Sequence, residues 1–225
     1  MEKTIGIIGG MGPKATNDLY NKIIDNTLAN SDGDHPHVII DSNTKIPDRT
    51  SFILKGGVSP SKALVRSALK LEYMGADFII IPCNTAHYFV SEIEKYTNIP
   101  VINIINQTAK YCKKKRMNRT LLLATEGTYK TNIYKKAFMR EGLEIVYPSG
   151  EEMNIVNREI YNLKSGFDVD TEAIKAIIDV YREQVSGVIL GCTELPVIFK
   201  GLSIGIDQID PTMVLAKAAL DYSKH

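Results

Sequence analysis

The sequence lacks the charge imbalance and the long apolar runs that mark two broad classes of protein. Its 27 lysines and arginines nearly balance 26 aspartates and glutamates, which leaves a net charge of +1. We therefore expect no nucleic-acid partner, and interpret the basic run at residues 113–116 as a solvated helix end. No apolar stretch approaches the ~18 residues that a membrane span requires, so we expect no membrane partner either.

Cysteine is also scarce, with three residues in a chain of 225. The cysteines form no C-x-x-C pair and none lies near a histidine at metal-ligand spacing, so we expect neither a disulfide framework nor a metal site. The first residues enter a strand without the basic, apolar and small-residue regions of a signal peptide. These features predict a cytoplasmic globular protein, for which a hydrophobic fraction of 44% provides a packed core.

Two of the three cysteines lie at the ends of apolar runs that resemble each other. One run covers residues 79–85 (IIIPCNT) and the other covers residues 188–194 (VILGCTE). A β-branched run that ends in a small residue or proline, followed by polar residues, is typical of a buried parallel strand that carries a side chain at its carboxyl end. Ligands of open α/β sheets bind at that edge, so Cys83 and Cys192 are predicted to face one cleft from opposite sides.

The rest of the chain follows an alternating α/β pattern. Helical patterns separate strand-like runs at residues 4–8, 38–41, 77–81, 101–103, 120–124, 144–146, 187–190 and 204–206. A helix is predicted to begin with Ser59 as N-cap and Pro60 at its first position, and to stop at Gly75. The pattern predicts doubly wound parallel sheets.

The sequence also indicates an internal duplication, because its two halves contain matching segments. Residues 5–12 (IGIIGGMG) and 121–128 (LLLATEGT) are both apolar strands that run into a small, polar, glycine-containing turn. We predict two pseudo-symmetric α/β domains with the active site in the cleft between them. The first comprises residues 1–105 together with the C-terminal segment 208–225, and the second comprises residues 106–207.

The first turn invites a second interpretation. Residues 10–15 (GMGPKA) match the dinucleotide fingerprint G-x-G-x-x-A, and Asp41 ends the next strand, where a ribose-binding acid would lie. That acid falls 31 positions after Gly10 (41 − 10), however, rather than about 20, and a nicotinamide would leave both cysteines unexplained. We expect no cofactor, because backbone N–H groups of this turn can instead bind a substrate carboxylate.

Cys83 and Cys192 are each followed by residues that should open a helix. A helix N-terminus lowers the pKa of a thiol, so both cysteines are predicted to do chemistry, whereas Cys112 lies on a helix without a turn motif and is predicted to be a core residue. His87 follows Cys83 by four residues and could act as the base of a cysteine hydrolase. No comparable histidine accompanies Cys192, which disfavours that activity.

Three charged residues complete the candidate site. Glu194 could orient a substrate ammonium group or simply open its helix. Arg49 lies in a loop, and its guanidinium suits a carboxylate. Lys164 has a weaker claim to the same role.

Five segments together resemble the cofactor-independent aspartate/glutamate racemases. They are residues 9–13 (GGMGP), 47–50 (PDRT), 82–87 (PCNTAH), 123–128 (LATEGT) and 191–194 (GCTE). The resemblance spans the whole chain and implies two α/β domains, no cofactor and a homodimer. Glutamate racemases usually carry an Asp-Ser pair in the first turn and histidine after the second Cys-Thr, whereas this chain has glycines and Glu194, so the resemblance favours aspartate as the substrate.

The resemblance and the residues together predict a racemase that interconverts L- and D-aspartate by two-base proton transfer. Cys83 and Cys192 are the predicted acid and base. The predicted substrate-binding residues are Met11, Gly12, Arg49, Asn84, Thr85, Thr125, Thr128, Lys164, Thr193 and Glu194. Two alternatives stay open: a related isomerase of another small acid such as glutamate, a hydantoin or maleate, and an amino-acid-binding protein without catalysis.

Overall fold

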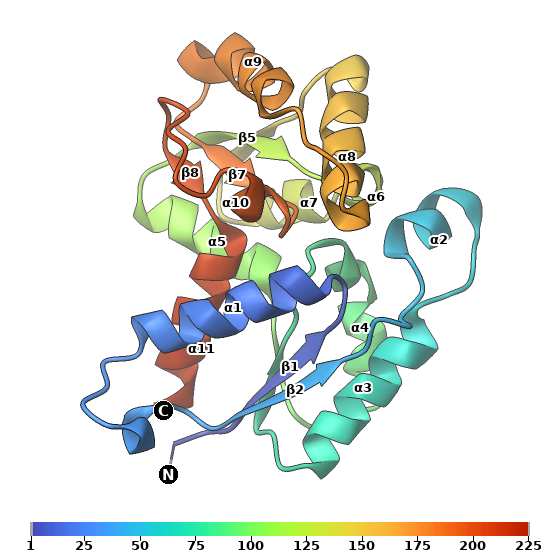
Figure 1. Ribbon diagram of the computed structural model, residues 1–225, viewed down its shortest axis with the longest axis vertical. Helices are drawn as coiled ribbons and strands as arrows, with labels where there is room; N and C mark the ends of the chain where they lie inside the picture. The colour runs from blue at the N-terminus through green and yellow to red at the C-terminus, as the bar shows by residue number, and fades with distance from the viewer. Residues whose placement is uncertain (1, 225) are drawn as a thin grey trace.

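The structure, a computed structural model, describes residues 2–224 and contains two parallel sheets, each of four strands (Figure 1). The first sheet has the order β2-β1-β3-β4, with β1 at Ile5–Gly9, β2 at Val38–Ser42, β3 at Phe78–Ile80 and β4 at Val101–Ile102. The second has the order β6-β5-β7-β8, with β5 at Arg119–Leu123, β6 at Glu144–Val146, β7 at Val188–Leu190 and β8 at Gln208–Ile209. The predicted α/β fold and the duplication of its topology are confirmed.

Helices cover both sheets and connect them. The first half carries α1 (Pro13–Asn26), α2 (Arg49–Lys55), α3 (Ser61–Tyr73) and α4 (Val90–Ile93), and the 3-10 helices η1 (Asp32–Asp34) and η2 (Thr85–Phe89). The long connecting helix is α5 (Ile104–Lys114). The second half carries α6 (Glu126–Thr131), α7 (Ile133–Arg140), α8 (Gly150–Ser165), α9 (Thr171–Tyr181), α10 (Leu195–Ile198) and the 3-10 helix η3 (Arg182–Gln184), and the chain ends in α11 (Pro211–Ser223).

Local sequence explains where several of these helices begin. Ser149 and Glu152 form a capping box at the start of α8, and the Asp210 carboxylate accepts hydrogen bonds from two backbone N–H groups at the start of α11. Helix α3 begins at Ser61, one residue later than predicted, with Pro60 as its N-cap. Its end agrees with the prediction, since Gly75 follows with a φ of +94°.

One predicted strand is wrong. Residues 204–206 form a loop, and the edge strand β8 lies four residues further on, where Gln208 pairs with Val188. Gly205 has a φ of +66°, which interrupts extended backbone. The carbonyl of Ile204 also accepts a hydrogen bond of 3.1 Å from the Arg182 guanidinium, rather than joining the sheet.

A shared hydrophobic core joins the two halves. Helix α11 follows the second sheet but contacts α1 and α5, and Tyr222 near its end packs edge-on against Phe78 of β3. The core between the sheets includes Leu19, Phe78, Ile104, Cys112, Leu122, Tyr134, Phe138 and Leu215. Helices α3 and α4 bury the opposite face of the first sheet, and α8 and α9 bury the opposite face of the second. This packing presents the carboxyl ends of β1, β3, β5 and β7 toward one cleft.

Within residues 2–224, the structure has no helix with both the length and the apolar character of a membrane span.

Candidate active site

The two cysteines that follow matching strands line one small cavity between the halves. Cys83 lies just after β3 and Cys192 just after β7, and each residue is only 6% exposed. The cavity has a volume of about 10 Å³, close to the space that one water molecule occupies. The structure therefore places both thiols beside the same enclosed space.

All the predicted substrate-binding residues except Gly12 and Thr128 line this cavity with the two cysteines. Gly12 lies at its edge, where a β-carbon would stand 3.3 Å from Oε1 of Glu194. Thr128 lies behind it, with its hydroxyl 2.8 Å from that of Thr85. The structure thus brings together residues that are spread over more than 180 positions of the sequence (194 − 11).

The cavity also contains residues that the sequence did not single out, namely Asp48, Thr50 and Gly191. Asp48 caps α2 by accepting a hydrogen bond of 2.7 Å from the Ser51 N–H. Its carboxylate also accepts a hydrogen bond of 3.3 Å from the hydroxyl of Tyr161. A capping aspartate before a helix is readable from sequence, but its contact with Tyr161 of the second half is not. Arg49, predicted to lie in a loop, is instead the first residue of α2, because Asp48 caps the helix there, and Asp48 links this helix start to α8.

Cys192 is held by a carboxylate. Its thiol donates a hydrogen bond of 2.9 Å to Oε2 of Glu194, which also accepts from the Thr193 hydroxyl at 3.3 Å. Burial, followed by the negative charge of Glu194, raises the pKa of Cys192 well above its ordinary value. The prediction that a helix N-terminus would lower this pKa is wrong, because α10 has only four residues and the carboxylate lies beside the sulfur.

Two cations face the thiols. Lys164 Nζ lies 4.0 Å from Oε2 of Glu194. Burial opposes the charge of Lys164, but Cys192 and Glu194 outweigh it and raise the pKa of the lysine. Burial likewise opposes the charge of Arg49, but Cys83 and Asp48 raise its pKa above the ordinary value. Both cations are therefore charged at neutral pH, with Arg49 buried and Lys164 still partly open to solvent.

Backbone carbonyls fix the orientation of Arg49. Its Nη1 donates to the Pro47 carbonyl at 3.2 Å and its Nη2 donates to the Met11 carbonyl at 3.3 Å. Its Nε is buried and has no partner among the described residues. A buried donor without a partner is costly. The open Nε is thus available to a bound anion.

Three threonine hydroxyls join the halves at the cavity. Thr85 of the first half lies 2.9 Å from Thr125 and 2.8 Å from Thr128, measured between Oγ1 atoms, and the latter two lie 3.1 Å apart. All three side chains are buried. Their hydroxyls can exchange partners within this ring, so one of them can turn its hydrogen toward a ligand.

His87 has a structural role. Its Nδ1–H donates to the Cys83 carbonyl at 2.9 Å, and its Nε2 accepts from the Ile104 N–H at 3.2 Å. Both ring nitrogens are therefore occupied by backbone groups, and burial lowers the pKa of His87 to about 4. The histidine stays neutral and does not reach the Cys83 sulfur as a base.

We expect His87 to make the stability of the protein depend on pH. Its folded pKa of about 4 lies below its ordinary value of 6.5, so the unfolded chain binds the extra proton between these values. The free energy of unfolding should therefore fall by up to about 3 kcal/mol as the pH drops from 6.5 to 4. Urea unfolding of the wild type and of His87→Gln across this range measures the effect. The difference in unfolding free energy between the wild type and His87→Gln should become smaller as the pH falls. A difference that stays constant across this pH range would contradict the proposed role of His87.

The backbone of the first turn is partly hydrogen-bonded by its own helix α1, through Thr16. Thr16 accepts from the Gly10 N–H at 2.9 Å and donates to the Gly12 carbonyl at 3.0 Å, so the turn satisfies part of its own backbone. Asp41, the expected ribose ligand, instead lies 3.6 Å from Lys70 Nζ. The turn contributes Met11 to the thiol cavity.

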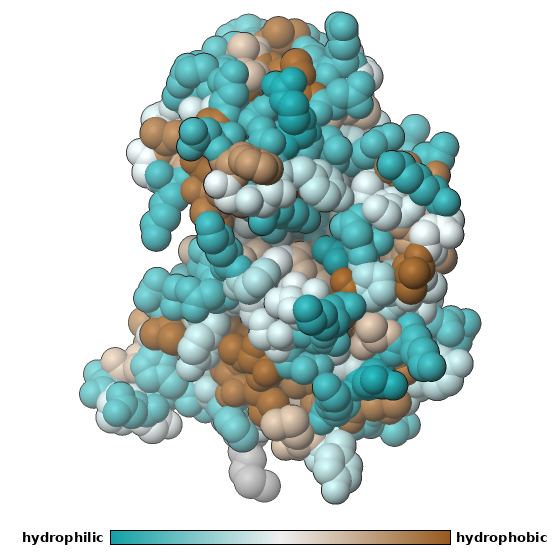
Figure 2. Space-filling view, turned by 45° about the vertical axis from the view of Figure 1, so that its right-hand side comes forward, coloured by the Kyte–Doolittle hydropathy of each residue, from teal (hydrophilic) through white to brown (hydrophobic). Residues whose placement is uncertain are grey.

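A second, roomier cavity adjoins the thiol cavity. It has a volume of about 270 Å³ and shares with it Met11, Asp48, Arg49, Lys164 and Glu194. The space-filling view shows a hollow in the surface between the two halves of the molecule (Figure 2). An amino acid does not fit within 10 Å³, so binding requires the residues between these cavities to move apart.

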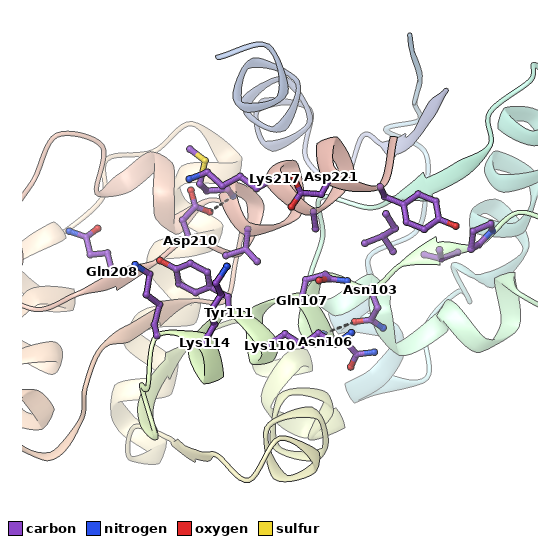
Figure 3. Close-up of a pocket in the computed structure, with 18 residues that line it drawn as sticks. Asn103, Asn106, Gln107, Lys110, Tyr111, Lys114, Gln208, Asp210, Lys217 and Asp221 are labelled. Carbon is purple, nitrogen blue, oxygen red and sulfur yellow. Dashed lines mark hydrogen bonds between the residues drawn. The ribbon is translucent and has the colours of Figure 1, made fainter. Parts of the chain in front are cut away.

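The groove between α5 and α11 is larger, at about 940 Å³, but differs in character (Figure 3). Its lining combines apolar residues such as Val101 and Val214 with charged side chains of the two helices, among them Lys110, Lys217 and Asp221. Neither Cys83 nor Cys192 borders it. Reactive groups rather than volume therefore identify the thiol cavity as the candidate active site.

Proteins of known function and structure resemble this chain over nearly its whole length. The family model for Asp/Glu/Hydantoin racemase matches residues 8–219. The broad specificity amino-acid racemase RacX of Bacillus subtilis (strain 168) is 30% identical, over 96% of this chain and 96% of that protein. Picrophilus torridus aspartate racemase has a TM-score of 0.89 and 33% identity, covering 99% of this chain and 94% of that one. An aspartate racemase homologue from Pyrococcus horikoshii OT3 has a TM-score of 0.80 and 32% identity, covering 99% and 100%.

Proposed function

Since the chain belongs to the Asp/Glu/hydantoin racemase family, we propose that it interconverts L- and D-aspartate by proton transfer between two cysteines, without a cofactor. The observation that carries this proposal is the placement of Cys83 and Cys192, each delivered by an equivalent strand of one half, beside a single closed cavity. Racemisation needs one acid–base group on each face of the α-carbon. Two thiols from opposite halves meet that need.

In the proposed reaction, one cysteine is a thiolate and the other a thiol. The thiolate takes the α-hydrogen as a proton, and the electron pair of the broken C–H bond stays on the substrate as a carbanion. The thiol then gives its proton to the opposite face of the α-carbon. Neither sulfur forms a covalent bond to the substrate. After one turnover the two cysteines have exchanged protonation states.

The raised pKa of Cys192 fits such a pair. Glu194 discourages a second negative charge beside it, whereas Lys164 compensates part of that cost. The reaction must start with one cysteine protonated and the other ionised, so that the pair holds a single thiol proton. Developing charge on the substrate would be stabilised by oriented donors around the cavity, including the Asn84 amide and the hydroxyls of Thr85 and Thr125.

The charges of the site favour an amino acid with an acidic side chain. We propose that Arg49 and Lys164 bind the side-chain carboxylate of aspartate, with the open Nε of Arg49 as one donor. Glu194 lies where it can face the substrate ammonium group. This anchoring would place the α-carbon between the two sulfurs.

We further propose a first domain of residues 1–105 and 208–225, a second domain of residues 106–207, a homodimer and a cytoplasmic location. The contacts of α11 with α1 and β4, which both lie within residues 1–105, support the assignment of the last helix to the first domain. Sedimentation of the purified protein tests the dimer.

Chiral chromatography of L-aspartate incubated with the purified, reduced protein tests the function directly. We expect D-aspartate to form without added cofactor or metal, and to approach an equal mixture from either enantiomer. Glutamate, alanine and lysine belong in the same panel, because the Bacillus relative is named for broad specificity. Conversion of another amino acid but not aspartate would reassign the substrate, and conversion of none would contradict the proposal.

A further inference from the structure

Asn84 presents a buried, unpartnered donor to the thiol cavity. The residue directly follows Cys83 and is only 2% exposed. Its Oδ1 accepts a hydrogen bond of 2.7 Å from the hydroxyl of Tyr134. Its Nδ2 has no hydrogen-bond partner among the described residues, although it is shielded from solvent. Since an unpaired buried donor costs free energy, its retention beside the cavity suggests that a ligand completes it.

Tyr134 sets which end of this amide faces the cavity. The tyrosine lies on α7 of the second half, is fully buried and packs against Phe138 with ring centroids 5.9 Å apart. Burial raises the pKa of Tyr134 well above its ordinary value, so the phenol keeps its proton and remains a donor. That proton needs an acceptor, which the amide oxygen supplies. Turning the amide around would remove this acceptor.

The contact also crosses between the two halves of the molecule. Asn84 lies after β3 of the first half, whereas Tyr134 lies after β5 of the second half, 50 positions later in the chain. The neighbouring Thr85 is held by Thr125 and Thr128 of the same second half. The segment after Cys83 is therefore oriented at two successive residues by groups from across the cleft.

We propose that Tyr134 is a positioning residue for the racemisation proposed above, on which this inference rests. Its hydroxyl fixes the Asn84 amide so that Nδ2 points into the cavity and donates a hydrogen bond to a carboxylate oxygen of the substrate. Tyr134 itself touches no reacting atom. Its effect on catalysis passes entirely through Asn84.

The kinetic test compares Tyr134→Phe, Asn84→Ala and the double variant. Tyr134→Phe keeps the ring and removes only the hydroxyl, and should lower kcat/KM about 5- to 150-fold. In the Asn84→Ala background the same change should have no further effect, within about twofold. Effects that multiply would show a separate structural role and overturn the proposal. Tyr147→Phe is the matched control, since it removes a buried hydroxyl that has no partner among the described residues.

Asn84→Asp separates the donor from the acceptor. The aspartate keeps an oxygen for Tyr134 but replaces the Nδ2 donor with a second acceptor. We expect it to lose at least as much activity as Tyr134→Phe, although the tyrosine contact survives. Wild-type activity in Asn84→Asp would contradict a donating role for Nδ2.

NMR of the side-chain amide tests the positioning without relying on activity. The Asn84 NH₂ signals are assigned by their loss in Asn84→Ala, and their heteronuclear NOE is compared between the wild type and Tyr134→Phe. A rigid amide in the wild type that becomes mobile or doubled in Tyr134→Phe supports the proposal, and an unchanged amide overturns it. Failure of the wild type to racemise aspartate would instead refute the proposed function and leave this measurement to decide the role of Tyr134.

Discussion

Replacement of either Cys83 or Cys192 by serine should lower the rate of aspartate racemisation about 10²- to 10⁴-fold, the range that general acid–base groups contribute. Serine has nearly the shape of cysteine, but its hydroxyl is far less acidic than a thiol. At position 192 the hydroxyl can still donate to Glu194 in place of the thiol. The fold should therefore survive while proton transfer fails, as measured by circular dichroism and by chiral chromatography.

The single variants should also differ from each other in a defined way. Each keeps one thiol on one face of the substrate, so residual exchange of the α-hydrogen without inversion should favour one enantiomer in Cys83→Ser and the opposite enantiomer in Cys192→Ser. Cys112→Ala is the matched control, because Cys112 is a fully buried core residue. Near-normal racemisation by either serine variant would defeat the two-thiol mechanism.

Arg49→Ala should lower kcat/KM for aspartate by about 30-fold to several thousand-fold. Removing one partner of a buried, hydrogen-bonded charge pair costs about 2–5 kcal/mol, which corresponds to this range. Arg49 is 7% exposed and its Nε has no hydrogen-bond partner within residues 2–224, so a substrate carboxylate would complete it. Steady-state kinetics with aspartate measure the loss.

Alanine, which lacks the side-chain carboxylate, serves as the comparison substrate for this prediction. If Arg49 binds that carboxylate, the preference of the enzyme for aspartate over alanine should collapse in Arg49→Ala. Lys45→Ala removes an exposed cation from the segment just before α2 and should leave the preference unchanged. An equal loss on both substrates would show that Arg49 acts on Cys83 or on the fold rather than on the side chain of the substrate.

The position of the candidate site could be predicted because the chain contains the same local sequence pattern twice. Buried apolar strands that end in small or polar residues place Cys83 and Cys192 at carboxyl ends, and parallel sheets bring those ends to one edge. The weakest strand prediction failed for a physical reason. Strand β8 has only two residues and lies at a sheet edge, so its own sequence gives a weak strand signal. The alternating Ile204 and Ile206 nearby gave a stronger strand signal although they lie in a loop.

The contacts that tune the site could not be predicted in the same way. The pKa of Cys192 depends first on its burial and then on the side-chain direction of Glu194, and the sequence encodes neither locally. Tyr134 reads as an ordinary core residue of an amphipathic helix, and only tertiary packing brings its hydroxyl to Asn84. Asp48 shows the intermediate case, since its capping role is visible in sequence but its contact with Tyr161 is not.

The most direct test of the two-thiol mechanism is the position of deuterium at early times in D₂O. L-Aspartate is incubated with the enzyme, the two enantiomers are separated after a small fraction has reacted, and the α-deuterium of each is measured by mass spectrometry. Proton removal by one cysteine and delivery by the other predicts deuterium in the D-aspartate formed and almost none in the L-aspartate that remains. Deuterium in the remaining L-aspartate at the same rate as in the product, or no deuterium in either, would contradict the mechanism.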